Sequence, residues 1–237
     1  MIQPLIIDTY SDAKFGDVKA LMDAGPPWHG FVHKLTQGTY HEETARVMQY
    51  RPTILAHPRY AVDFWEGYYC FLDLNQAAVE QADYYWAMMM KCGGEKLGTL
   101  WAMIDVERGG QSHIPSAAQV FDGVTAWANR YEQLSGRKPT LYGGELLRAL
   151  GIHKPGAPVN LLGCGRNSIA MYNATLPENV VIATGTDEAD LLDWQYCGDG
   201  EAYLKGYPTS APGFGPIDIN VLTTPGGLDG LRTQLKP

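Results

Sequence analysis

Two acidic residues, Asp105 and Glu107, stand two positions apart near the middle of the chain. If this stretch is a β-strand, both side chains lie on one face, with Cβ atoms about 6 to 7 Å apart. Like charges at that distance compete for protons, which favours one ionised carboxylate and one carboxylic acid. Hydrolysis of a glycosidic bond needs such a pair. The alternative is a structural role, in which the two acids cap a helix or bind a cation.

The stretch that carries the pair, Thr99–Glu107, alternates in character as a strand does. One face is wholly apolar and consists of Leu100, Ala102, Ile104 and Val106. The other face consists of Thr99, Trp101, Met103, Asp105 and Glu107. We expect the apolar face to pack under helices and the other face to look into a barrel, with the carboxylates at the carboxyl end of the strand.

Strand-like and helix-like stretches alternate on both sides of this strand. The predicted strands are Pro4–Asp8, Gly30–Leu35, Glu66–Leu72, Pro139–Tyr142, Asn160–Leu162, Val180–Ile182, Leu191–Tyr196 and Ile217–Val221. The predicted helices are Phe15–Ala24, a stretch from Glu42, Gln76–Met90, Ser116–Leu134 and Glu145–Leu150. This order predicts an α/β fold with a parallel sheet: a single-domain (β/α) barrel, similar to a TIM barrel and irregular or incomplete in its last third. The barrel is expected over residues 1–222, followed by a short tail over 223–237.

Two further acids end or begin predicted strands. Asp8 closes the first strand, and Asp218 shares one face of the last strand with Asn220. If the sheet closes, the first and last strands become neighbours, and four carboxyl groups surround one pocket that suits a positive or sugar-like ligand. The alternative is that Asp8 and Asp218 only begin turns.

Aromatic residues concentrate near the same strand ends. They are Trp65, Tyr68, Tyr69, Trp101, Tyr142, Tyr172, Trp194 and Tyr196. The apolar C–H faces of sugar rings stack on aromatic rings, so acids together with aromatics are typical of a carbohydrate site. The same rings also suit the hydrophobic core.

Composition excludes several other functions. The net charge of −8 comes without a basic block, which argues against nucleic acid as a partner. No apolar run approaches the roughly 18 residues that span a bilayer, so membrane insertion is not expected. No export signal is visible at the N-terminus, so synthesis in the bacterial cytoplasm without a signal peptide is expected. Four cysteines without C-x-x-C spacing predict reduced, buried thiols.

Competing chemistries have weaker support. His29 and His33 share a predicted strand face, but no third ligand stands at a metal-site spacing, so neither a metal site nor a cofactor is expected. The chain has no Gly-x-Ser-x-Gly elbow and no P-loop. Gly163-Cys164-Gly165 lacks the third glycine of a dinucleotide-binding motif.

From Ile6 to Leu222 the chain resembles the lysozymes of glycoside hydrolase family 25, the Chalaropsis-type N-acetylmuramidases found among phage endolysins and bacterial autolysins. Ile104-Asp105-Val106-Glu107 is the most specific element of the resemblance. The other matching elements follow in order: Ile7-Asp8, Lys34-Leu35-Thr36-Gln37-Gly38, Gly67-Tyr68-Tyr69-Cys70-Phe71, Thr140-Leu141-Tyr142, Trp194-Gln195-Tyr196 and Ile217-Asp218-Ile219-Asn220.

The resemblance implies a muramidase that cuts the β-1,4 bond between N-acetylmuramic acid and N-acetylglucosamine in the peptidoglycan glycan strand. It implies that Glu107 is the general acid and Asp105 its partner carboxylate. It leaves open whether Asp105 or the substrate's own 2-acetamido group attacks. The implied substrate-binding residues are Asp8, Asp218, Tyr69, Trp101, Tyr142, Trp194 and Gln195. We expect action on the wall after holin-dependent release or delivery by a particle, without a separate wall-binding domain.

The sequence also departs from the family pattern. Thr9-Tyr10-Ser11-Asp12 replaces the usual x-Ser-x-x-Gln after the first aspartate, and Cys70 stands where the family often has His. These departures leave two alternatives open: a non-catalytic carbohydrate-binding barrel, and a glycosidase that acts on another glycan.

Overall fold

The computed structural model describes residues 3–10, 16–93, 101–109, 111, 113–151, 162, 164–170, 191–198, 200–202 and 204–222. Its strands are β1 (Leu5–Thr9), β2 (Trp28–Gln37), β3 (His41–Glu42), β4 (Trp65–Phe71), β5 (Trp101–Val106), β6 (Thr140–Gly143), β7 (Arg166–Ala170), β8 (Leu191–Gly198), β9 (Glu201–Ala202), β10 (Ser210–Ala211), β11 (Gly215–Pro216) and β12 (Asp218–Leu222). Its helices are α1 (Val18–Asp23), α2 (Thr44–Ala56), α3 (Ala78–Lys91), α4 (Ala117–Ser135) and α5 (Glu145–Ala149).

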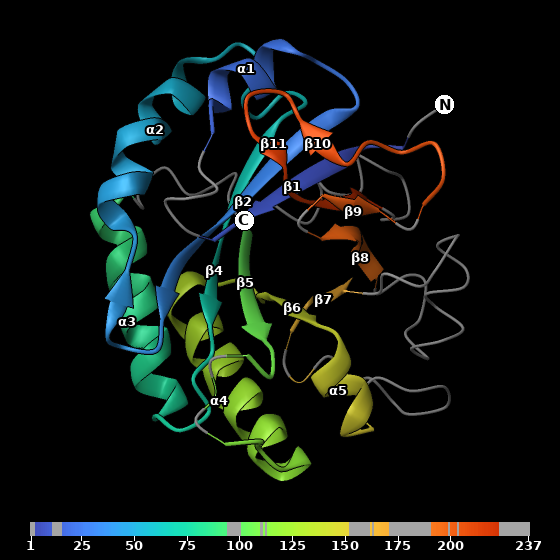
Figure 1. The fold of residues 1–237 in the computed structure, drawn as a ribbon. Helices are drawn as coiled ribbons and strands as arrows, with labels where there is room; N and C mark the ends of the chain where they lie inside the picture. The colour runs from blue at the N-terminus through green and yellow to red at the C-terminus, as the bar shows by residue number, and fades with distance from the viewer. Residues whose placement is uncertain are drawn as a thin grey trace.

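Eight of these strands close into a barrel in the order β1-β12-β8-β7-β6-β5-β4-β2, and β2 pairs with β1 to complete the circle (Figure 1). The predicted barrel is therefore confirmed. The prediction of a parallel sheet fails at β12, which runs antiparallel to both β1 and β8. The described residues between β8 and β12 contain no helix, and an antiparallel neighbour needs no crossover helix.

Most predicted elements match observed ones, and two strand predictions fall wholly or almost wholly outside the described residues. Val180–Ile182 lies outside the described residues, as does Asn160–Leu162 apart from Leu162, which lies in a turn. The strand β7 was not predicted from the sequence.

The two faces of the barrel strands form two hydrophobic cores. On β5, Ala102, Ile104 and Val106 belong to the large outer core between the strands and the helices. Met103 belongs to a smaller cluster inside the barrel, together with Ile6, Val32, Trp65, Tyr69, Tyr142, Ala170 and Leu222. Figure 1 shows α2, α3 and α4 along the outside of the strands. The prediction that one face of β5 packs under helices and the other faces the barrel interior is confirmed.

Local sequence explains the longest helix of the outer layer. Ser116 caps α4 by accepting a hydrogen bond from the backbone N–H of Gln119, whose side chain bonds back to the Ser116 backbone. Gly136 ends the helix in the left-handed conformation, at φ 72°. Among the described residues, no helix is long and apolar enough to cross a membrane.

Candidate active site

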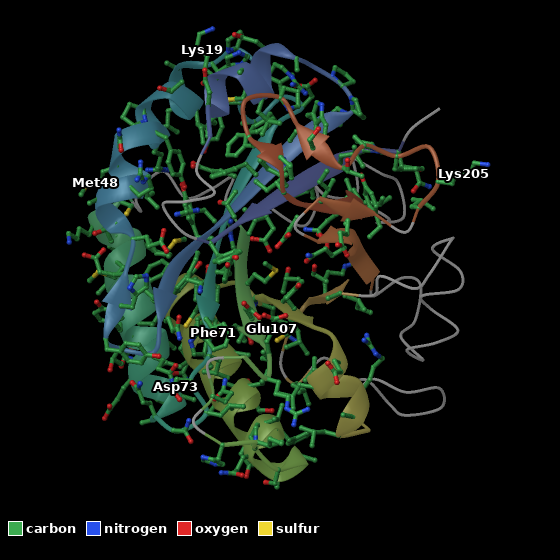
Figure 2. The ribbon with its side chains drawn as sticks, viewed as in Figure 1. Lys19, Met48, Phe71, Asp73, Glu107 and Lys205 are labelled. Carbon is green, nitrogen blue, oxygen red and sulfur yellow. The ribbon has the colours of Figure 1, made fainter. Side chains whose placement is uncertain are left out.

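A pocket of about 310 Å³ opens at the carboxyl ends of the parallel strands, where α/β barrels keep their active sites. Figure 2 shows Glu107 and Phe71, which both line it, beside each other at the ends of β5 and β4. The described lining residues are Asp8, Tyr10, Lys34, Tyr69, Phe71, Asp105, Glu107, Gly109, Tyr142, Gln195 and Asp218.

Strand pairing brings the four acids to this pocket from three strands. Asp105 is in β5, and Glu107 follows directly after the strand ends. Asp8 of β1 stands directly opposite Asp218 of β12 in the antiparallel register. The sequence-based prediction that barrel closure gathers these four carboxyl groups is confirmed.

Burial and mutual repulsion raise the pKa of three of these carboxyl groups. Burial raises the pKa of Asp105 well above its usual range, and Glu107 and Asp8 raise it further. The same causes raise the pKa of Asp8, with Asp218 and Glu107 as its charged neighbours. The pKa of Glu107 is raised by burial and by Asp218. A raised pKa keeps a carboxyl group protonated closer to neutral pH, as a general acid requires.

Two of these acids keep an oxygen without a partner. Within the part of the chain that the structure describes, Oδ1 of Asp8 and Oδ1 of Asp105 are buried and accept no hydrogen bond. Leaving a buried polar atom unsatisfied costs about 1 to 3 kcal/mol. Such atoms in a pocket are available to accept hydrogen bonds from a ligand or from water.

Lys34 brings a positive charge into the acidic pocket. It is the one basic side chain among the described lining residues. Its Nζ lies over the rings of Phe71, Tyr10 and Tyr69, at 5.3, 5.6 and 5.9 Å from their centroids. The charge lowers the pKa of Asp8, Asp105 and Glu107, so it opposes the effect of burial.

Tyr142 and Gln195 also line the pocket and contact each other. The Tyr142 hydroxyl donates a hydrogen bond of 2.6 Å to Oε1 of Gln195. This bond ties β6 to β8 across the unpredicted strand β7 and fixes both side chains at the pocket.

A fifth acid lies in the barrel interior. Asp193 of β8 is 2% exposed, and its Oδ1 accepts a hydrogen bond from the Ser168 hydroxyl of β7. Burial raises the pKa of Asp193 to about 7. Its charge in turn raises the pKa of Asp8.

The profile of glycosyl hydrolases family 25 matches residues 7–202. The chain belongs to this family. It is therefore a glycoside hydrolase, and the resemblance read from its motifs is confirmed. No curated protein sequence matches the chain.

Solved structures share the fold of this family 25 chain over nearly its whole length. A muramidase from Trichobolus zukalii has 21% sequence identity and a TM-score of 0.68, over 98% of this chain and 99% of that one. A family GH25 lysozyme from Aspergillus fumigatus has 18% identity and a TM-score of 0.69, over 99% and 100%. The catalytic domain of endolysin ply40 from bacteriophage P40 of Listeria monocytogenes has 15% identity and a TM-score of 0.62, over 98% of each chain.

Seven of the nine predicted site residues of the family 25 chain line the pocket: Asp8, Tyr69, Asp105, Glu107, Tyr142, Gln195 and Asp218. Trp101 begins β5, four residues before Asp105, and its side chain is outside what the structure describes. Trp194 lies in β8 between Asp193 and Gln195, and its side chain is outside what the structure describes.

Four described lining residues were missed, Gly109 among them, and the sequence carried a signal for the other three. Tyr10 stands two positions after Asp8, and Phe71 stands two positions after Tyr69, so each pair shares a strand face. Lys34 opens one of the matching motifs. The sequence analysis also did not identify Asp193, whose charge raises the pKa of Asp8.

The four cysteines and the two histidines considered as metal ligands are not among the described lining residues of the pocket. Cys70, which departs from the family pattern, is fully buried in the outer core. All four cysteines are free and buried, as predicted. His29 bonds the backbone oxygen of Asp63, while His33 contacts Thr9 and Glu43. Within the described residues, no group of three or more His, Cys, Asp or Glu side chains is arranged to hold a metal ion.

Proposed function

We propose that this family 25 glycoside hydrolase is a muramidase, which cleaves the β-1,4 bond between N-acetylmuramic acid and N-acetylglucosamine in peptidoglycan. The observation that carries the proposal is the pair Asp105 and Glu107, two carboxyl groups of raised pKa from one strand end in a pocket rich in aromatic rings. Two solved structures of the same fold are described as muramidases, which supports the choice of glycan.

In the proposed mechanism, Glu107 acts first as an acid. Its proton passes to the bridging oxygen as the bond to the anomeric carbon breaks, and the leaving sugar departs with a free hydroxyl group. Asp105 faces the positive charge that develops on the anomeric carbon, whether Asp105 or the substrate's 2-acetamido oxygen forms the bond there. Glu107, now ionised, takes a proton from a water molecule as the water attacks the anomeric carbon and displaces the group bonded there, which completes hydrolysis and restores the acid.

The other groups of the pocket support these two steps. The unpartnered Oδ1 atoms of Asp8 and Asp105 are available to accept hydrogen bonds from the sugar. The charge of Lys34 lowers the pKa of Asp105 and Glu107, so it favours ionisation of an acid in the pocket. Tyr69 and Phe71 add aromatic rings to the lining of the pocket, which suits contact with a sugar.

Product analysis tests this proposal. Purified protein is incubated with bacterial peptidoglycan, and the soluble fragments are reduced with borohydride and analysed by mass spectrometry. We expect fragments with reduced muramic acid ends, and about a thousand-fold less product with Glu107→Gln, which keeps the shape and removes the transferable proton. Reduced glucosamine ends would refute the assigned bond. Intact walls together with cleavage of another glycan would refute the assigned substrate.

The biological setting that we propose is lysis of the bacterial cell wall by a phage. The protein would be made in the bacterial cytoplasm and reach the wall by holin-dependent release or with a particle. The likeness to an endolysin catalytic domain from a Listeria phage supports this setting. Expression in a bacterial cytoplasm should leave cells intact until a holin is co-expressed, and lysis without a holin would contradict the proposed route.

A further inference from the structure

A second recess adjoins the pocket at the acid itself. It has a volume of about 150 Å³, and its described lining residues are Glu107, Arg108, Gly109, Gly144, Glu145 and Leu146. Glu107 and Gly109 line both hollows. The general acid thus stands on the boundary between a larger hollow and a smaller one.

The position of the acid assigns a role to each hollow. A glycosidase acid protonates the oxygen that joins two sugars, so one sugar lies on each side of it. The larger pocket holds Asp105 and Asp8, which suit the sugar that becomes positively charged. The smaller recess lies beyond Glu107 and has no aromatic ring among its described lining residues.

Resting on the proposed muramidase function, we infer that this smaller recess is the subsite of the leaving sugar, a neutral N-acetylhexosamine held by Arg108 and Glu145. Arg108 and Glu145 are exposed at the recess. Arginine only donates hydrogen bonds and an ionised glutamate only accepts them, so together they match the hydroxyl and acetamido groups of an uncharged sugar.

The walls of the recess are held in place by neighbouring strands. Arg148 of α5 donates to the backbone oxygen of Ala170, at the end of β7, over 2.9 Å. A Cβ on Gly144 would come within 3.0 Å of Ala170, so the start of α5 is closely packed there. On the other side, Gln111 donates to the backbone oxygen of Leu72 over 2.7 Å, which ties the loop after β5 to the end of β4. A site formed between fixed walls loses little conformational freedom on binding.

The first test compares two substrates that differ only on the leaving side. One is the tetrasaccharide made of two GlcNAc-MurNAc units, and the other is an aryl glycoside of a single GlcNAc-MurNAc unit. We expect Arg108→Ala and Glu145→Ala to lower the ratio of kcat/KM for the tetrasaccharide to kcat/KM for the aryl glycoside by about ten-fold to a hundred-fold. An unchanged ratio would refute the subsite. Lys205→Ala is the control, since this exposed lysine lies far from Glu107 in Figure 2.

The second test needs no turnover, so it separates the subsite from the proposed reaction. In the Glu107→Gln background, the tetrasaccharide should bind more tightly than the disaccharide GlcNAc-MurNAc, as measured by calorimetry. Adding Arg108→Ala should weaken tetrasaccharide binding by about ten-fold and leave disaccharide binding as it was. Equal affinities for the two saccharides, or a tetrasaccharide affinity that Arg108→Ala does not change, would overturn the inference even if the protein is a muramidase.

Discussion

Two buried acids on neighbouring strands, Glu66 of β4 and Asp105 of β5, show how the two faces of one barrel treat a carboxyl group differently. Burial raises the pKa of both. On the outer face, Glu66 accepts hydrogen bonds from Arg51 Nε at 3.0 Å, Tyr68 at 2.6 Å and Tyr60 at 3.2 Å. On the inner face, Asp105 has the carboxyl groups of Glu107 and Asp8 as neighbours, which the charge of Lys34 opposes, and its Oδ1 accepts no hydrogen bond from the described residues.

The comparison separates a structural acid from a functional one where burial alone does not. The partners of Glu66 offset its loss of hydration, so its charge serves to hold β4 against α2. Around Asp105, the described residues do not offset the loss of hydration of Oδ1, and we expect a bound substrate to do so. Removing the acid should therefore damage the fold at Glu66 and the reaction at Asp105.

The largest effect is expected for Asp105→Asn. The amide keeps the shape of the side chain but cannot carry the negative charge that faces the anomeric carbon, so kcat should fall by about a hundred-fold to ten-thousand-fold. Peptidoglycan digestion under steady-state conditions measures this. Activity close to wild type would show that Asp105 is not the partner carboxylate.

The same variant should be at least as stable as the wild type, and the difference should depend on pH. A carboxyl group with a raised pKa in the folded state stabilises the fold below its unfolded pKa, and this contribution is lost as the pH rises through the folded pKa. Thermal unfolding should therefore give Asp105→Asn a Tm advantage that is small at pH 4 and grows towards pH 8. A Tm advantage that is largest at pH 4 would contradict the raised pKa.

Glu66→Gln should have the second largest effect, and it should fall on stability. The change leaves Arg51, which is 4% exposed, without its charged partner, and breaking a buried ion pair from one side costs about 3 to 5 kcal/mol. Denaturant unfolding measures the loss, and kcat/KM of the folded protein should be unchanged. The double variant Arg51→Met with Glu66→Leu should recover much of the stability, because no charge remains buried. A loss of activity without a loss of stability would reverse the assignment.

Features that depend on local sequence were predicted, and features that depend on packing between distant elements were not. Alternation along β5 predicted the face that carries Asp105, and the expected closure of the barrel predicted that Asp8 lies near Asp218. Neither the ion pair of Arg51 with Glu66 nor the direction of β12 follows from local pattern, because both depend on how distant elements pack.

Lys34→Met should have a smaller effect, one that shifts the pH profile of the reaction. Its charge lowers the pKa of Asp105 and Glu107, so removing it should raise the pKa of both and move the activity profile to higher pH by on the order of one pH unit. The pH dependence of kcat/KM measures the shift. Lys34→Arg keeps the charge and should shift the profile less, and Lys205→Met should not shift it. A uniform loss of activity at all pH values would assign Lys34 to packing instead.

The smallest effect is expected where two sequence neighbours face opposite sides, at Tyr69 and Cys70. Cys70 is fully buried in the outer core, so Cys70→Ala should destabilise the fold by about 1 kcal/mol and leave the activity of the folded protein unchanged. Tyr69 lines the pocket, so Tyr69→Phe should instead lower kcat/KM by about ten-fold if its hydroxyl bonds the sugar. If Cys70→Ala changes the products formed from peptidoglycan, then a residue on the outer face contributes to specificity, and the division between the two faces fails at this strand.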